Sequence, residues 1–129
     1  MEALRQLKTD PGPGALRTAF RIFDAWGLDD PQANRLLGVP RSTYYRWKRD
    51  AGSAQLSKDT LERISYLLGI YKNLQIVLPD PKAADAWVTR ANDAPAFQGQ
   101  PPIARLAAGN VADLYVVRRY LDAVRGDKV

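Results

Sequence analysis

The sequence contains no cysteine and no histidine. The absence of cysteine excludes disulfides, thiol nucleophiles and cysteine-based zinc sites, and the absence of histidine removes the commonest metal ligand and general base. Catalysis would have to depend on Asp, Glu, Lys, Ser or Tyr. The 14 acidic residues are scattered singly, apart from Asp29 and Asp30 beside a proline. We therefore expect a protein that is not an enzyme and that uses no metal and no cofactor.

Long hydrophobic runs are absent as well. No apolar stretch approaches the roughly 20 residues that span a bilayer, and the first residues lack the hydrophobic segment of a signal peptide. The 129 residues, 46% hydrophobic and 26% charged, resemble an ordinary globular domain or two small helical subdomains that share a core. We expect a cytoplasmic protein that does not associate with membranes.

The net charge of +5 is unevenly distributed. Residues 1–58 contain ten Lys and Arg against six Asp and Glu, whereas residues 59–129 contain nine against eight. Four cations of the first half fall within nine residues and have no acidic residue between them: Arg41, Arg46, Lys48 and Arg49. Such a run is typical of a surface that faces phosphate, although a run taken alone is more often a solvated helix face.

Apolar spacing and helix-end signals predict an all-α fold. The prolines and glycines at 11–14 predict a flexible lead-in over residues 1–14, and the first helix is expected to begin after it and to end at Gly27. Asp30 followed by Pro31 predicts the start of a short helix, because an Asp side chain can cap free N–H groups and proline fits the first helical position.

The second half is expected to be helical too. Residues 74–78 are ambiguous between helix and strand, and 92–102 are punctuated by proline and glycine and predict a loop. Helices are expected after the caps Ser57 and Asp80, over one turn at 103–107, and over 111–125.

Residues 30–50 are a helix-turn-helix candidate, because two short helices flank a three-residue turn. Gly38 lies at the turn, where the backbone favours positive φ, and Val39 plugs it. Tyr44 and Trp47 are expected to point inward and to anchor the second helix. Asn34 stands where helix-turn-helix proteins usually have a small apolar residue, so this contact is expected to be looser or hydrogen-bonded.

The outward residues of the second helix are the predicted DNA contacts. Arg41 or Arg46 could bind a guanine bidentately, whereas Lys48 and Arg49 suit phosphates. The full predicted set is Arg41, Ser42, Thr43, Tyr45, Arg46, Lys48 and Arg49.

Residues 15–126 as a whole resemble the MbcA/ParS/Xre antitoxin family. In the first half the resemblance depends on Gln32 to Val39 and on Arg41 to Trp47, a pattern that many helix-turn-helix proteins share. The second half is more specific, because the order and spacing of the family's toxin-binding domain are matched by Trp87, Asn92, Phe97, Gly99, Pro102, Leu106, Gly109 and residues 117–122.

Three positions depart from the family pattern and bear on the conformation of the loop. Ala91 replaces a proline that commonly precedes the asparagine, Gln98 replaces one of a usual glycine pair, and Pro101 replaces a small polar residue.

The resemblance implies a type II antitoxin with a helix-turn-helix domain over 15–78 and a helical toxin-binding domain over 79–129. The implied partner is an NAD-consuming RES-domain toxin or a ParT-like ADP-ribosyltransferase, whose NAD pocket the C-terminal half covers while the complex represses its own promoter. The implied toxin contacts are Trp87, Asn92, Phe97, Gly99, Arg118, Arg119 and Arg125.

Structural roles compete with these toxin contacts. The guanidinium groups of the last helix suit carboxylates or an NAD-phosphate pocket, but Arg118 could simply pair with Asp122 four residues later. Trp87 and Phe97 are better explained as anchors of the core or loop than as toxin contacts.

Two other functions remain open. One is a stand-alone helix-turn-helix repressor whose second half senses a ligand or dimerises, and the other is an interaction adaptor without a DNA role. Helix-turn-helix proteins generally bind half-sites about 34 Å apart as dimers, so a homodimer within a toxin–antitoxin hetero-oligomer is expected.

Overall fold

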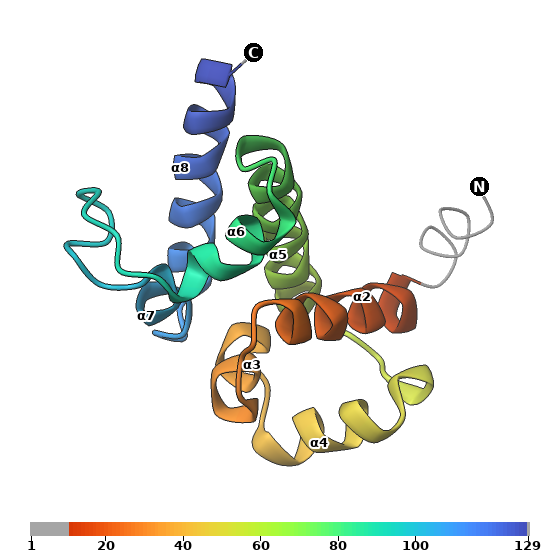
Figure 1. Cartoon of the computed structure of the whole chain (residues 1–129). Coiled ribbons are helices and arrows are strands. Elements are labelled where there is room, and N and C mark those ends of the chain that lie inside the picture. The colour runs from red at the N-terminus through yellow and green to blue at the C-terminus, as the bar shows by residue number, and fades with distance from the viewer. Residues whose placement is uncertain (1–10, 129) are drawn as a thin grey trace.

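The structure is a computed structural model that describes residues 11–128, and every regular element in this part is a helix. Three helices and a short 3-10 turn form the lower part of the molecule in Figure 1, and a long helix leads from them to the C-terminal half. In chain order they are α2 (Pro11–Ala25), α3 (Asp30–Leu37), α4 (Arg41–Arg49), η1 (Ala51–Ser53), α5 (Lys58–Val77), α6 (Pro81–Ala86), η2 (Trp87–Thr89), α7 (Pro102–Leu106) and α8 (Val111–Lys128).

The first helix begins earlier than its sequence predicts. Residues 1–10 lie outside the described chain, but α2 already includes Pro11 to Gly14, so the expectation of a lead-in that reaches residue 14 was wrong. Proline is tolerated in the first turn of a helix, where its missing N–H would have no partner anyway. This turn also packs closely, because a methyl group at Gly12 would lie 3.4 Å from the carbonyl oxygen of Ala54.

The cap of α3 lies one residue before the expected one. Asp29, not Asp30, accepts a hydrogen bond from the Gln32 amide at 2.9 Å, and the Gln32 side chain accepts one from the Asp29 amide at 3.0 Å. This reciprocal capping box satisfies two free N–H groups at the helix start. Asp30 is thereby free to bind side chains of α4.

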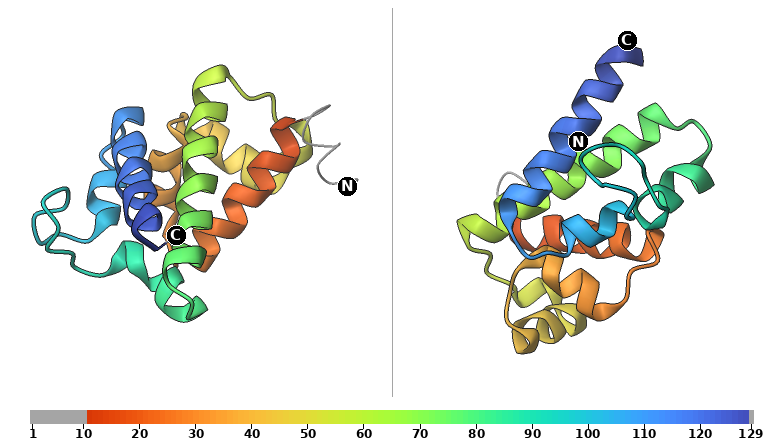
Figure 2. Two further views of the ribbon diagram at one scale, coloured as in Figure 1. Left: turned by 90° about the horizontal axis from the view of Figure 1, so that it is seen from above. Right: turned by 90° about the vertical axis from the view of Figure 1, so that its left-hand side faces the viewer.

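Helix α5 is the element that both halves share. Ser57 caps it, its helical part extends to Val77 through most of the ambiguous segment, and its side chains Ile64, Leu67 and Leu74 are fully buried. It packs against α2 on one side and α8 on the other, as the left view of Figure 2 shows. One hydrophobic core therefore runs through the N-terminal and C-terminal halves.

Helix α8 continues to Lys128, three residues beyond the expected end. Its apolar seam follows the expected spacing, since Leu114, Val117 and Leu121 are buried. The fold is all-α as predicted, with a helix-turn-helix arrangement near its N-terminus and a helical C-terminal half.

Candidate nucleic-acid interface and partner-binding half

The turn between α3 and α4 has the geometry that its sequence predicts. Gly38 adopts φ 68°, the left-handed conformation that glycine accepts readily. Asn34 donates a hydrogen bond from Nδ2 to the carbonyl oxygen of Val39 at 2.8 Å. The polar residue at this position therefore ties the first helix to the turn.

Two aromatic side chains anchor α4, as predicted. Tyr44 and Trp47 are 2% and 4% exposed, respectively. The Tyr44 ring meets Phe20 of α2 edge-on, with the ring centroids 5.7 Å apart. Aromatic pairs of this kind contribute about 0.5–1.5 kcal/mol beyond the burial of area. The orientation of α4 is thus set by its packing on α2.

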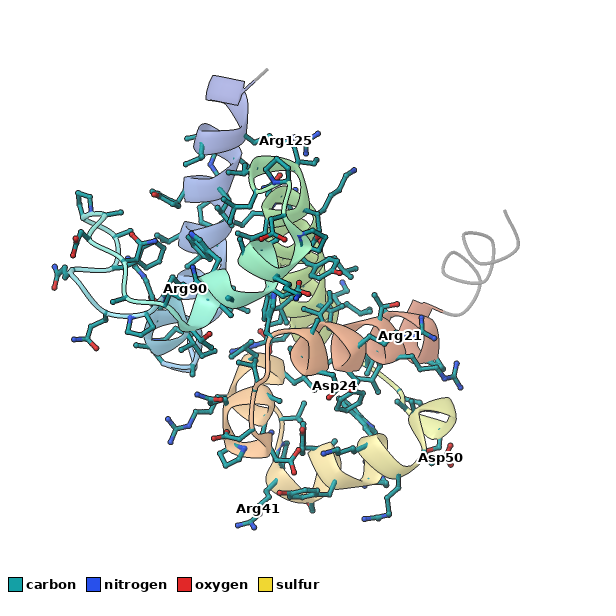
Figure 3. All side chains as sticks on the ribbon, in the orientation of Figure 1. Arg21, Asp24, Arg41, Asp50, Arg90 and Arg125 are labelled. Atoms are coloured by element: carbon teal, nitrogen blue, oxygen red, sulfur yellow. The ribbon has the colours of Figure 1, made fainter. Side chains whose placement is uncertain are left out.

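The opposite face of α4 is open to solvent. Five of the seven predicted DNA contacts are exposed, and the other two, Thr43 and Tyr45, are half-buried. The Arg41 guanidinium lies over the Tyr45 ring at 5.7 Å from its centroid, and Figure 3 shows Arg41 pointing away from the body of the molecule. The exposed contacts are Arg41, Ser42, Arg46, Lys48 and Arg49.

Lys48 differs from the other cations of α4 because it has a carboxylate partner. Its Nζ lies 2.6 Å from Oδ1 of Asp30, which also accepts a 2.7 Å hydrogen bond from the Tyr44 hydroxyl. The hydrogen bond from Lys48, followed by that from Tyr44, lowers the pKa of Asp30, while the bond to Asp30 raises the pKa of Lys48. A phosphate would have to compete with Asp30 for this lysine.

Two further cations beside α4 were not among the predicted DNA contacts. Arg17 and Arg21 of α2 are exposed and line a hollow of about 470 Å³ together with Lys48 and Arg49. The sequence signal was present, since both arginines lie on the polar face of an amphipathic helix. What the sequence did not show is that this face adjoins α4.

The loop between η2 and α7 is closed by its own backbone. The amide of Asn92 donates to the carbonyl oxygen of Gln100 at 3.2 Å, and the amide of Gly99 donates to that of Asn92 at 2.8 Å. The side-chain oxygen of Asn92 accepts a 2.9 Å hydrogen bond from the Ala94 amide. Asn92 therefore fixes the shape of the loop.

Gln98 is strained at its place in this loop. Its φ is 52°, the one positive value of a residue other than glycine in the described chain, and Gly99 follows at φ 83°. A positive φ is unfavourable for a residue with a Cβ. Two glycines would suit these two consecutive positive φ values, and this chain has Gln98 and one glycine there.

Three aromatic rings attach the loop to α8. Phe97, which is 4% exposed, meets the rings of Trp87 and Tyr120 edge-on, at centroid distances of 5.5 and 5.3 Å. Trp87 stacks on Tyr120 at 6.3 Å. Phe97 is therefore an anchor of the loop, whereas Trp87 and Tyr120 remain partly exposed.

Comparison with known protein families accounts for both halves. Residues 6–69 match the antitoxin Xre-like helix-turn-helix domain, and residues 73–126 match the antitoxin Xre/MbcA/ParS C-terminal toxin-binding domain. The chain belongs to the Xre/MbcA/ParS antitoxin family. It is an antitoxin of a toxin–antitoxin system, and its partner is a toxin protein.

The chain is also similar to a curated protein over most of its length. The chain is 43% identical over 115 residues to the uncharacterized protein y4oB of Sinorhizobium fredii (strain NBRC 101917 / NGR234). The matched region covers 88% of this chain and 86% of that protein. No solved structure matches the chain. The first family match ends at residue 69 and the second begins at residue 73, both within α5. The domain boundary after residue 78 that the sequence suggests stays a prediction.

In the toxin-binding half of the antitoxin, two of the three predicted arginines bind within the chain. Arg118 lies 3.5 Å from Asp122, as its spacing suggested, and its guanidinium covers Gly69 of α5. Arg125 donates to Oδ1 of Asn73 at 3.2 Å, and Asn73 donates to Asp122 at 2.7 Å. This network joins α5 to α8.

Of the remaining predicted toxin contacts, Arg119 is exposed on α8, Asn92 and Gly99 are half-buried in the loop, and Trp87 is half-buried beside it. Arg119 is thus the predicted arginine for which the described chain provides no hydrogen-bond partner.

Among the residues that the structure describes, a buried arginine of α5 contacts both domains of the antitoxin. Arg63 of α5 is 8% exposed; its Nε lies 2.9 Å from Asp59 and its Nη2 donates to the carbonyl oxygen of Gly109 at 3.0 Å. The same guanidinium covers Gly38 of the turn. Arg63 therefore connects the helix-turn-helix with the segment between α7 and α8.

Two features are absent between residues 11 and 128. No group of three acidic, cysteine or histidine residues in this part lies close enough to hold a metal ion. None of its helices combines the length and the apolar character that crossing a membrane requires.

Proposed function

We propose that the chain is the antitoxin of a type II module, that it neutralises an NAD-consuming RES-domain toxin or a ParT-like ADP-ribosyltransferase by covering the active site, and that it represses its own operon. The observation that carries this proposal is the spatial separation of two exposed surfaces on a chain with one continuous hydrophobic core. The recognition helix α4 lies at one end of the molecule and the C-terminal end of α8 at the other (Figures 1 and 2). One chain can then contact DNA and a toxin at the same time.

The exposed face of α4 supports the DNA-binding part. A helix of about 10–12 Å diameter fits the major groove, which is about 12 Å wide. Arg41 and Arg46 are exposed and have no carboxylate partner in the described chain, so they are available for base edges or phosphates. Ser42, at the start of the helix, lies where recognition helices contact bases.

The C-terminal half supports the toxin-binding part. The loop at 91–101 and the exposed side of α8 lie together, because the Trp87, Phe97 and Tyr120 rings join them. Arg119 presents a planar and permanently charged guanidinium on α8, which suits the carboxylates or phosphate site of an NAD pocket.

The toxin-binding part is tested by coexpression with the adjacent reading frame. We expect that the neighbouring gene alone stops growth and depletes cellular NAD or ADP-ribosylates a target, and that this antitoxin restores growth and copurifies with its product. A neighbouring gene product that is harmless, or growth arrest that the antitoxin does not relieve, would contradict this part. Operator binding that a metabolite switches without any protein partner would instead support the stand-alone repressor.

The DNA-binding part is tested with the DNA immediately upstream of the gene. The triple variant Arg41→Ala, Arg46→Ala and Arg49→Ala is expected to lose binding to this DNA and repression of a reporter. The matched control removes three exposed cations elsewhere: Lys72→Ala, Lys82→Ala and Arg90→Ala. Equal binding by both variants would show that α4 is not the DNA-binding surface.

The homodimer is tested by the mass of the protein in solution and by the symmetry of the protected DNA. Two half-sites about 34 Å apart, one helical turn of DNA, are expected for a dimeric helix-turn-helix protein. Protection of a single half-site by a monomer would contradict the dimer.

A further inference from the structure

A basic hollow separates α2 from the C-terminal part of α4. Its volume is about 470 Å³, and both helices line it. Phe20 and Trp47 contribute apolar surface, while the charged side chains at its edge come from α2 and α4 alike. These charged residues are Arg17, Arg21, Asp24, Lys48 and Arg49.

The two arginines of α2 lie one helical turn apart. Residues four positions apart are neighbours on one face of a helix, so Arg17 and Arg21 present their guanidinium groups together. An Nη atom of Arg17 would lie 3.3 Å from a methyl group at Gly52, which places this guanidinium over η1 at the end of α4. The side chains of α2 thus extend the cationic surface that begins on α4.

The charge of the hollow is unbalanced. Four of the lining residues are cations and one, Asp24, is acidic. Lys48 binds Asp30 outside the group, and Oδ1 of Asp50 lies near the Arg17 guanidinium, since a methyl group at Gly52 would be 3.4 Å from the former and 3.3 Å from the latter. No ion pair joins Arg17, Arg21 or Arg49 to a carboxylate among the residues that the structure describes. Such a concentration of like charge is unfavourable unless an anion lies nearby.

The geometry of DNA indicates which anion this is. A recognition helix nearly fills the width of the major groove, so a group beside it meets the sugar–phosphate rim and not the bases. Helix α2 lies beside α4 through the contact between Phe20 and Tyr44. Guanidinium groups bind phosphate bidentately through their planar array of donors.

We propose that Arg17 and Arg21 of α2, together with Arg49 of α4, form a phosphate clamp that binds the DNA backbone along one rim of the groove that α4 enters. This inference rests on the proposed DNA binding and adds a second helix to it. Because phosphates are the same in every sequence, the clamp contributes to affinity and to the register of α4 and not to the choice of bases.

The clamp is tested by the salt dependence of DNA binding. The full-length protein and the double variant Arg17→Ala, Arg21→Ala are titrated against the upstream DNA and against a scrambled duplex of equal length. Each phosphate contact contributes about 0.9 to the slope of log affinity against log salt, so the double variant should lose about 2 from the slope. At 0.15 M salt this corresponds to roughly 5-fold weaker binding for each contact, by about the same factor for both duplexes.

Three comparisons make the result specific. The variant Arg17→Lys, Arg21→Lys keeps the charge and is expected to restore the slope. The control variant Lys82→Ala, Arg90→Ala removes two exposed cations of the C-terminal half and is expected to keep the full slope. Figure 3 shows Arg90 on the part of the molecule that lies away from α4.

A variant that is expected to tighten DNA binding, and not to weaken it, adds to the test. Asp24→Asn removes the one carboxylate that lines the hollow and is expected to tighten binding to both duplexes. Circular dichroism and urea unfolding of every variant confirm that the fold is retained, as the exposure of Arg17 and Arg21 leads us to expect.

The outcomes separate this inference from the proposed function. Upstream DNA that the unmodified protein does not bind would overturn both. Binding of that DNA by the unmodified protein, with an unchanged salt slope in Arg17→Ala, Arg21→Ala, would overturn the clamp alone. A double variant that loses preference for the upstream DNA, but keeps its slope, would show that these arginines read bases and would likewise overturn it.

Discussion

The guanidinium of Arg63 lies against Gly38, so closely that a methyl group on this glycine would come within 2.5 Å of the Arg63 Cζ atom. Gly38 is needed for two reasons, because its φ of 68° disfavours a Cβ and because Arg63 occupies the space that a Cβ would take. The turn of the helix-turn-helix is thereby tied to α5 and, through Gly109, to the toxin-binding half.

Gly38→Ala is expected to destabilise the protein by about 3–5 kcal/mol in urea unfolding. The left-handed conformation costs a residue with a Cβ about 1–2 kcal/mol, and displacing Arg63 loses a buried charged hydrogen bond of about 1.5–3 kcal/mol. Gly27→Ala is the matched control, since Gly27 has φ 69° but nothing within 4 Å of a methyl group. Equal losses for the two variants would show that Arg63 does not restrict the site.

Gly69→Ala tests the second close contact between a glycine and an arginine. A methyl group at Gly69 would overlap the Arg118 guanidinium, so the usual gain of about 1 kcal/mol for alanine over glycine within a helix is offset. We expect that gain to reappear when Arg118→Ala is already present. Gly126→Ala in α8 meets nothing within 4 Å and serves as the control. Stabilisation by Gly69→Ala alone, equal to that of the control, would contradict the contact.

Asp30→Asn is expected to strengthen DNA binding by releasing Lys48. If Lys48 then contacts one more phosphate, the salt slope should rise by about 0.9 and the affinity by roughly 5-fold at 0.15 M salt. Asp29→Asn is the control, because it removes the same charge next to Asp30, keeps a good helix cap and leaves the pair of Lys48 and Asp30 in place. The same increase in both variants would indicate a general charge effect.

The lowered pKa of Asp30 leads us to expect that the stability of the protein depends on pH. Hydrogen bonds from Lys48 and Tyr44 lower the pKa of Asp30 in the folded protein below the ordinary value of 3.8 for an aspartate. Its contribution to stability is therefore complete above pH 3.8 and is lost as the pH falls through the lowered folded pKa. Between about pH 6 and pH 2, the unmodified protein should lose more unfolding free energy than Asp30→Asn does. Parallel curves for the two proteins would contradict this assignment.

Phe97→Ala is expected to detach the loop at 91–101 from α8 and to weaken toxin binding. Truncation of a buried phenylalanine costs about 3–5 kcal/mol, and here the loss should fall mainly on the loop. Hydrogen exchange of the Asn92 and Gly99 amides measures the opening of the loop directly, because both amides are hydrogen-bonded within the loop. Gln98→Gly, which suits the φ of 52°, should keep exchange slow. Unchanged exchange in Phe97→Ala would show that the ring is not the anchor.

Local sequence signals were sufficient to predict the helices, the turn and the inward side of α4. Helix caps, glycines at positive φ and apolar spacing act over a few residues, so Gly38, Tyr44 and Trp47 could be placed from their neighbours alone. Where local signals competed, they were less decisive. Two adjacent aspartates could each have capped α3, and the prolines at the start of α2 were compatible with the first turn of a helix as well as with a lead-in.

The groups that several cations contact depend on how the helices pack and could not be predicted from spacing. Lys48 pairs with Asp30, 18 residues away, Arg63 reaches Gly109, 46 residues away, and Arg17 and Arg21 adjoin α4 because Phe20 packs on Tyr44. Long side chains find partners according to which helices pack together, and this depends on the burial of apolar surface over the whole chain. Spacing along one helix carries no information about those neighbours.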